Sequence, residues 1–313
     1  MRRFIIKLSI FCGLFLAIDS MCALLIKHGI DRYYGFNRDA KILVVGHSRT
    51  VFGIDGLLLE NKTKQSVAKY AIQGTTLIDH LMMFKHYISE HPNSVKTAVY
   101  VVDDYMFGKG LGTNQYRLFY PYIDNQVVDS YIRQSVPTFT DYLSHKVLKL
   151  YRYSETTVQN TARMGYRGKT ELSPDTKTDV NVLKKKIASA NMNDQRKVIS
   201  ENIEQFNKIL RFLRDSNIKV VLFYMPFIDL LAKDNLENHK NSVEIFRALA
   251  RKDDGILFVD ACADYAVRHD LFVDATHPNR TGQILFTSEL AKSIVVLPVE
   301  GSMNNVNSAA QND

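Results

Sequence analysis

Cysteine is scarce in this chain of 313 residues, and the few copies present lie where they can build little. There are three, and two of them, Cys12 and Cys22, fall inside an apolar N-terminal segment. Only Cys262 is left for the rest of the sequence, so the body of the protein cannot form an internal disulfide. The histidines likewise show no spacing that would build a metal site. We therefore expect no disulfide framework, no metal and no cofactor.

A strong charge of either sign is also missing. The formal net charge is +7, and leaving out three basic residues and one acidic residue of the N-terminal segment (Arg2, Arg3, Lys7 and Asp19) reduces it to +5. No basic run alternates with aromatic residues, which argues against nucleic acid as a partner. A diffuse charge of this size fits an anionic surface or polymer nearby, and it equally fits a charge that only keeps the protein soluble.

One long apolar run is present, at the N-terminus. It extends from Leu8 to Ile26, is interrupted by Asp19, and follows the basic residues. Counted from Phe4, about 23 residues are available, which is enough to cross a bilayer, and no small-residue cleavage site ends the run. We therefore expect residues 1–28 to form a retained membrane anchor, with a cleaved signal sequence as the alternative. The basic start predicts that the body lies outside the cytoplasm, on the periplasmic or extracellular side.

After a linker at residues 28–40, the sequence alternates between short apolar runs and stretches with helical spacing. The strand-like runs lie at residues 42–45, 66–72, 97–102, 218–224 and 256–259, and the helical patterns at 77–90, 199–213, 243–251 and 278–294. This alternation predicts a three-layer α/β/α fold with a mostly parallel sheet, whose carboxyl-end loops converge on one site. His80 and His86, on the first helix, are expected at the surface or core edge rather than as ligands.

An irregular stretch, about residues 105–190, interrupts the alternation and predicts a cap inserted into a single α/β domain of residues 29–300. Eight of the sixteen tyrosines of the chain lie between Tyr116 and Tyr166. They would either form a platform for sugar rings or pack the cap onto the core or a membrane interface. The tail at residues 301–313, rich in Asn and Ser, is predicted to be disordered.

The candidate nucleophile is Ser48. It follows the strand-like run 42–45 and Gly46, at the point where the chain must turn, so its hydroxyl is expected to be exposed at a strand end. If a helix begins near Thr50, the N–H groups of its first turn point toward Ser48 and could stabilise negative charge on a reacting oxygen.

The candidate base lies near the other end of the chain. His277 precedes Pro278, a residue favoured at the first helical position, so the imidazole is expected at the mouth of the last helix. Asp274 lies three residues earlier and can hold one ring nitrogen while the other accepts a proton from serine. The sequence therefore predicts Ser48 as the nucleophile, His277 as the base and Asp274 as the residue that orients it.

These motifs resemble those of the SGNH or GDSL-like hydrolases. Gly46-His-Ser48 resembles their N-terminal Gly-Asp-Ser-type block, and Asp274-Ala-Thr-His277 matches their C-terminal Asp-x-x-His block. The resemblance covers about residues 41–295 and is strongest to membrane-tethered members associated with cell-envelope and polysaccharide acylation. It implies an SGNH or flavodoxin-like α/β fold. The α/β-hydrolase type is less similar, because Thr50 stands where its motif has a second glycine.

The resemblance also implies an oxyanion hole, which this sequence completes only in part. Backbone N–H groups of Ser48 and of Gly74, which follows the second strand-like run, would hold the oxyanion. The family usually supplies an asparagine after the third strand, where this chain has Asp103-Asp104, and we take Asp104 as a further candidate. His47 also stands in place of the usual acidic residue.

We therefore expect a membrane-tethered serine acyl-ester hydrolase or acyltransferase, acting outside the cytoplasm on an acylated polysaccharide or another envelope ester. The alternative is a non-catalytic envelope binding or assembly protein with the same fold. His47 and Asp104 favour that alternative, whereas the intact Asp274 and His277 count against it. The acyl group, the acceptor and the oligomeric state stay open.

Overall fold

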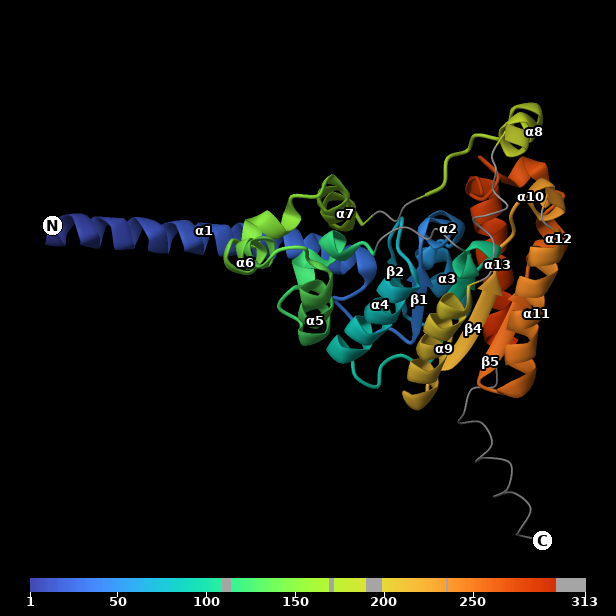
Figure 1. Ribbon diagram of the computed structural model, residues 1–313, viewed down its shortest axis with the longest axis horizontal. Helices are drawn as coiled ribbons and strands as arrows, with labels where there is room; N and C mark the ends of the chain where they lie inside the picture. The colour runs from blue at the N-terminus through green and yellow to red at the C-terminus, as the bar shows by residue number, and fades with distance from the viewer. Residues whose placement is uncertain (109–113, 169–171, 190–198, 235, 297–313) are drawn as a thin grey trace, which may run out of the picture.

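The computed structural model describes residues 1–108, 114–168, 172–189, 199–234 and 236–296 (Figure 1). The tail predicted to be disordered lies outside these residues, as do parts of the predicted insertion.

A parallel sheet of five strands forms the centre of the body. Its strands are β1 (Ile42–Gly46), β2 (Val67–Ala71), β3 (Thr97–Val102), β4 (Lys219–Tyr224) and β5 (Ile256–Asp260). They lie in the order β2-β1-β3-β4-β5, and every neighbouring pair is parallel. The first three strands are buried along their whole length, as expected for apolar runs that are covered on both faces. The α/β prediction is confirmed, and all five strand-like runs are strands.

Helices cover both faces of the sheet and make three layers. One face packs against α4 (Leu77–Glu90), α9 (Ser200–Asp215) and α11 (Leu236–Lys252). The other packs against α2 (Ser48–Gly53), α3 (Gly56–Thr63) and α13 (Arg280–Val296). Because the strands are parallel, their carboxyl ends lie along one edge, where the loops leading to α2, α4 and α13 can meet.

The N-terminal helix is longer than expected. α1 runs without a break over Arg2–Tyr34, so the first part of the predicted linker is helical, and it ends only at Gly35, whose φ of 86° belongs to the left-handed region. Residues 2–18 are exposed, whereas Ile30 and Tyr34 are buried in the core. By length and composition α1 is able to cross a membrane. Figure 1 shows its first half extending away from the body.

The segment between β3 and β4 wraps the second half of α1. It contains the short helices η1 (Asp104–Phe107), η2 (Tyr116–Tyr122) and η3 (Lys149–Tyr153), and α5 (Gln126–Ser135), α6 (Phe139–Val147), α7 (Thr156–Tyr166) and α8 (Val180–Ser189). The crossing of α7 with α1 is close, because a Cβ on Gly165 would lie 1.8 Å from the carbonyl oxygen of Gly29. The remaining described helices are α10 (Asp229–Asp234), α12 (Cys262–Tyr265) and η5 (His269–Leu271).

The two histidines expected at the surface or the core edge, rather than as ligands, are fully buried. His80 and His86 are 2% and 0% exposed. Tyrosine hydroxyls from the sheet provide their partners: Tyr100 lies 2.8 Å from Nδ1 of His80, and Tyr70 lies 3.2 Å from Nδ1 of His86. Burial lowers the pKa of both imidazoles to about 3, so they are neutral at physiological pH.

Candidate active site

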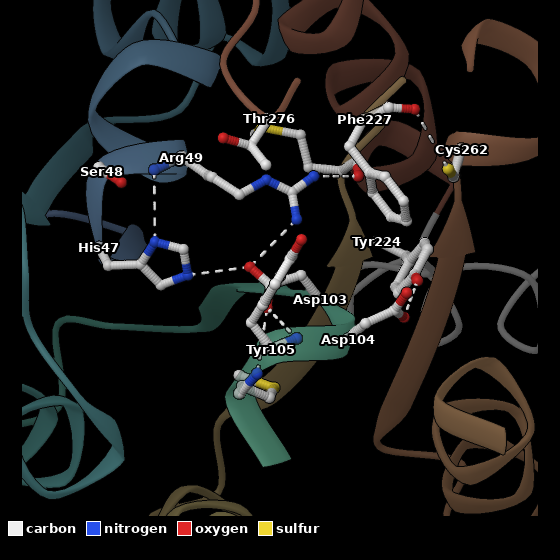
Figure 2. Close-up of polar contacts among 12 residues, drawn as sticks. His47, Ser48, Arg49, Asp103, Asp104, Tyr105, Tyr224, Phe227, Cys262 and Thr276 are labelled. Carbon is white, nitrogen blue, oxygen red and sulfur yellow. Dashed lines mark hydrogen bonds and ion pairs between the residues drawn. The ribbon is translucent and has the colours of Figure 1, made fainter. Parts of the chain in front are cut away.

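Ser48 lies at the carboxyl end of β1 as the first residue of α2, so the helix begins two residues earlier than expected. Gly46 permits the turn, because a Cβ there would lie 2.0 Å from Oγ1 of Thr50. His47 is the N-cap residue, and its Nδ1 accepts a long hydrogen bond of 3.4 Å from the backbone N–H of Arg49 (Figure 2). The strand end and the cap together fix the position of the Ser48 side chain.

The structure places Ser48, His277 and Asp274 in one hydrogen-bonded row. Oγ of Ser48 lies 3.0 Å from Nε2 of His277, and Nδ1 of His277 lies 2.9 Å from Oδ2 of Asp274. Asp274 also accepts the backbone N–H groups of Thr276 and His277, both at 2.8 Å, so the loop holds its own carboxylate in place. With Nδ1–H donating to Asp274, Nε2 is the acceptor for the serine O–H.

The loop of His277 differs from the sequence expectation at one point. Pro278 does not begin the last helix but forms an isolated bridge with Phe272, and α13 starts at Arg280. Asn279 caps the helix instead, since its Oδ1 accepts the N–H of Gly282 at 3.0 Å. Because the helix starts two residues after Pro278, His277 lies on the preceding loop. Its ring meets the ring of Phe52 nearly at a right angle, with centroids 5.5 Å apart.

Asp274 is an ionised partner over a wide pH range. Partial burial raises its pKa, but the hydrogen bonds from His277 and from the backbone of Thr276 outweigh this and lower the pKa to about 2. A carboxylate that stays charged favours the imidazolium that forms when His277 takes a proton. The electrostatics therefore suit a base that is positioned for proton transfer.

A small cavity of about 260 Å³ opens in front of Ser48. Its lining includes His47, Ser48, Gly74, His80, Asp103 and Tyr105, together with residues 75–77 and Met106. Gly74 has a φ of 78°, which other residues rarely adopt, and this conformation turns the loop after β2 toward the cavity. The two backbone groups predicted to hold an oxyanion, those of Ser48 and Gly74, thus belong to residues that line the same cavity.

Asp103 forms the back of this cavity, and the sequence alone did not single it out. Its side chain is 1% exposed, and both carboxylate oxygens are paired. Oδ2 lies 3.0 Å from both Nε2 of His47 and Nη1 of Arg49, and Oδ1 accepts the N–H groups of Tyr105 at 2.9 Å and Met106 at 3.1 Å. Burial raises the pKa of Asp103, but His47 and Arg49 outweigh it and hold the pKa well below its usual range. Asp103 is therefore a paired carboxylate with no proton to donate.

Asp104, the candidate for the oxyanion site, is directed elsewhere. Its carboxylate accepts a hydrogen bond from the hydroxyl of Tyr224 and lies 3.1 Å from Nδ1 of His239. Figure 2 shows Asp103 facing His47 and Arg49 while Asp104 points toward Tyr224. Successive side chains at a strand end point in opposite directions, so only one of the two carboxylates can face Ser48. The acidic residue that lines the cavity after β3 is therefore Asp103 and not Asp104.

A second network supports the loop that carries Gly74. The hydroxyl of Thr75 donates to the carbonyl of Ile72 at 2.7 Å, so it accepts from Nε2–H of His80 at 3.0 Å, and Nδ1 of His80 accepts from Tyr100. The neutral His80 thus joins the sheet to the loop. The only signal in the sequence was a histidine one turn into the helix after the loop, which is too common a pattern to identify this role.

A larger hollow on the other side of β4, of about 660 Å³, offers no comparable chemistry. It is lined by His239, Lys240, Glu244, Arg247, Asp260 and Cys262, among others. Burial raises the pKa of the Cys262 thiol to about 12, so this side chain is a poor nucleophile. Among the described residues there is also no group of three potential metal ligands. The site at Ser48 is therefore the candidate active site.

Comparison with known proteins gives similarities of fold only. No family model and no curated protein matches the sequence. One similar solved structure is a Streptococcus pneumonia protein described provisionally as a platelet activating factor, with 11% identity and a TM-score of 0.46, covering 92% of this chain and 98% of its own. Another is a Desulfitobacterium hafniense DCB-2 protein described as lipolytic and of the G-D-S-L family, with 10% identity and a TM-score of 0.39, covering 80% of this chain and 97% of its own.

Proposed function

We propose that this protein is a membrane-tethered serine enzyme that cleaves or transfers acyl esters. The observation that carries the proposal is the row Ser48–His277–Asp274, in which a hydroxyl, an imidazole and a carboxylate lie at 3.0 and 2.9 Å. These three groups come from opposite ends of the chain, and their order in space is the one that activates a serine. Ser48 and His277 are the catalytic residues of the proposal, and Asp274 positions His277.

The reaction follows from the hydrogen-bond directions. Oγ of Ser48 attacks the ester carbonyl carbon while its proton passes to Nε2 of His277, and the backbone N–H groups of Ser48 and Gly74 stabilise the resulting oxyanion. The C–O bond to the leaving alcohol then breaks, and His277 gives its proton to that alcohol. A water or a sugar hydroxyl next loses its proton to Nε2 of His277 as it attacks the acyl carbonyl carbon. The bond from that carbon to Oγ of Ser48 then breaks, and His277 returns the proton to Oγ. Water gives hydrolysis, and a sugar gives acyl transfer.

The cavity limits the acyl group. Its volume of about 260 Å³ is small, since pockets for drug-sized ligands typically span about 300–1,000 Å³. Space of this size favours a short acyl chain such as acetyl. With α1 as an anchor and the body outside the cytoplasm, the substrate would be an acylated envelope polysaccharide or another envelope ester.

One observation favours a second candidate, a binding or assembly protein without turnover. Asp103 occupies the place where an amide donor would complete the oxyanion hole, and its carboxylate is already committed to His47 and Arg49. Among the described residues, the backbone N–H groups of Ser48 and Gly74 are then the donors that we propose for the oxyanion. Loss of one such donor is worth about 10²–10³ in rate in a known serine protease, so a slow enzyme is expected before a dead one.

Covalent labelling distinguishes the two functions. The full-length protein in detergent is treated with a fluorophosphonate probe, with Ser48→Ala as the matched control, and hydrolysis of an activated acetyl ester is measured in parallel. Labelling of the wild type at Ser48, together with hydrolysis that the control lacks, supports the enzyme. A folded wild type that neither reacts with the probe nor hydrolyses the ester would establish the binding protein.

A further inference from the structure

An apolar surface lies beside α1 where this helix enters the body. We name it the α6–η3 surface, and it consists of Phe139, Leu143, Val147, Leu148, Leu150 and Tyr151, each of which is at least 38% exposed. α6 is followed by η3, which lies against α1, and Figure 1 shows α6 at the end of the body from which the N-terminal half of α1 emerges. A contiguous exposed patch of large apolar side chains in a folded protein indicates a surface that is covered in use.

The orientation of α6 is fixed by its other face. Tyr142 and His145 are buried, the ring of His145 stacks on Tyr120 with centroids 3.5 Å apart, and the Tyr142 hydroxyl donates to Asp129 at 2.7 Å. Phe139, Leu143 and Val147 follow one another at a spacing of four and form a separate stripe on the exposed side. The stripe is therefore held outward by a well-packed helix.

Asp19 ties this surface to a defined level of α1. It interrupts the apolar run, yet it is 5% exposed, and its carboxylate accepts the backbone N–H groups of Lys149 at 2.8 Å and Leu150 at 3.0 Å. A carboxylate within an apolar segment is tolerated in lipid only when its hydrogen bonds are satisfied inside the protein. The two N–H groups of η3 satisfy the Asp19 carboxylate inside the protein. They also place the start of η3 against α1 at residue 19.

The length of α1 decides how deep that level lies. Residues 2–18, 17 in all, are the part that is exposed throughout. At about 1.5 Å per residue they span roughly 26 Å, whereas the hydrocarbon core of a bilayer is about 30 Å thick and needs about 20 residues. Counted from Phe4, about 20 residues end at Ala23, beyond Asp19. The boundary of the lipid on the side of the body then falls past the Asp19–η3 contact.

We propose that the α6–η3 surface lies in the bilayer, at the boundary between acyl chains and head groups of the leaflet on the side of the body. The occupant of the surface is lipid, because a span counted from Phe4 ends past the Asp19–η3 contact, so the apolar side chains that adjoin this contact lie at the level of the lipid boundary. This inference rests on the proposed role of α1 as an anchor. The protein would then contact the membrane twice, through α1, which spans the bilayer, and through the α6–η3 surface, which lies at the lipid boundary.

Fluorescence quenching tests the proposal, because the chain contains no tryptophan. Full-length single-tryptophan variants are reconstituted into two kinds of vesicle, whose lipids carry bromine either near the head-group end of the acyl chains, to reach position 147, or near the terminal end of the chains, to reach position 14 at the middle of the span. Val147→Trp reports the α6–η3 surface, Leu14→Trp reports the exposed half of α1, and Val267→Trp is the matched control. Val267 is 68% exposed and follows α12, which lies on the far side of the body from α1 in Figure 1.

The expected result is loss of emission for Leu14→Trp and Val147→Trp and no loss for Val267→Trp. Quenching at Leu14 alone would overturn the inference while leaving the anchor intact, and a blue-shifted but unquenched Val147→Trp would then assign the surface to a second copy of the chain. Absence of quenching at Leu14 would overturn the anchor and the inference with it. Each variant is first checked for probe labelling at Ser48, which reports the catalytic site independently of the membrane.

Discussion

Replacing Asp103 by asparagine tests whether the Asp103 carboxylate stabilises the site through its pairing with His47 and Arg49, or only lines the cavity. In the wild type, Oδ1 of Asp103 accepts two backbone N–H groups, and Oδ2 faces Nε2 of His47 and the buried guanidinium of Arg49. The carbonyl oxygen of the asparagine side chain would still accept the two backbone N–H groups. Its NH₂ group, however, would face the N–H donors of His47 and Arg49. Arg49 would then be a buried cation without its counter-ion.

The structure gives the magnitude of this effect. Breaking a buried ion pair by removing one partner costs about 3–5 kcal/mol of unfolding free energy. The matched control is Asp104→Asn, whose new side chain can still accept from Tyr224, so its cost should be about 1–2 kcal/mol. Both residues are buried and adjacent. A difference between the two losses of unfolding free energy therefore measures the pairing of Asp103 with His47 and Arg49 rather than burial.

The pH dependence adds a second readout. His47 and Arg49 hold the pKa of Asp103 well below its usual range in the folded protein, in spite of burial. The stabilisation from this ionised carboxylate is therefore present above the unfolded value of about 3.9 and is lost as the pH falls below it. The difference in unfolding free energy between wild type and Asp103→Asn should be largest at neutral pH and should become smaller in acid.

Thermal and denaturant unfolding of the full-length proteins, followed by circular dichroism, measure these quantities. Equal costs for Asp103→Asn and Asp104→Asn, or a gap that does not change with pH, would refute the assignment of Asp103 as the paired anchor of the site. Hydrolysis of an activated ester is measured on the same samples. A well-folded Asp103→Asn protein with raised turnover would instead show that the carboxylate opposes the oxyanion.

Three further results are expected. Ser48→Ala and His277→Ala should each abolish most turnover of an activated acetyl ester, and the double variant should be little worse, because the pair acts as one unit; multiplicative losses in kcat/KM would contradict this. Asp274→Asn should be comparable or milder, since it disturbs the tautomer of His277 rather than removing a reacting group. The folded pKa of Asp274, about 2, lies below the unfolded value, so its stabilising effect holds above about pH 4 and is lost toward pH 2, where acid titrations of wild type and Asp274→Asn should converge. Protease added to spheroplasts should digest the body, and digestion only after lysis would place it in the cytoplasm.

The fold and the Ser48–His277 neighbourhood were accessible from the sequence because their signals are local. Buried parallel strands are continuous apolar runs, and residues at the carboxyl ends of such strands meet at one edge. Ser48 follows the first strand and His277 precedes the last helix, so the rule brings them together without knowledge of any contact. Their catalytic roles stay predictions until the variants are measured.

What the sequence could not provide are contacts between distant segments. Whether Asp103 or Asp104 faces Ser48 depends on the direction in which β3 ends, which a shift of one residue would reverse. His80 and His86 are buried because Tyr100 and Tyr70, on separate strands, supply hydroxyl partners. Likewise, α1 continues beyond residue 28 through the point where Gly165 of α7, from a distant part of the chain, packs on Gly29.

If α1 is the proposed anchor, its unbroken course has a consequence for release of the body from the membrane. Proteases preferentially cut exposed and flexible segments, so a tethered body is released most easily where such a segment joins it to its anchor. In this chain the exposed turns of α1 pass directly into turns that carry the buried residues Ala23, Ile30 and Tyr34. A cut anywhere in that half would remove part of the core along with the anchor. With α1 as the anchor, the body should therefore stay at its membrane, and the proposed enzyme should act only on substrates that are brought to it.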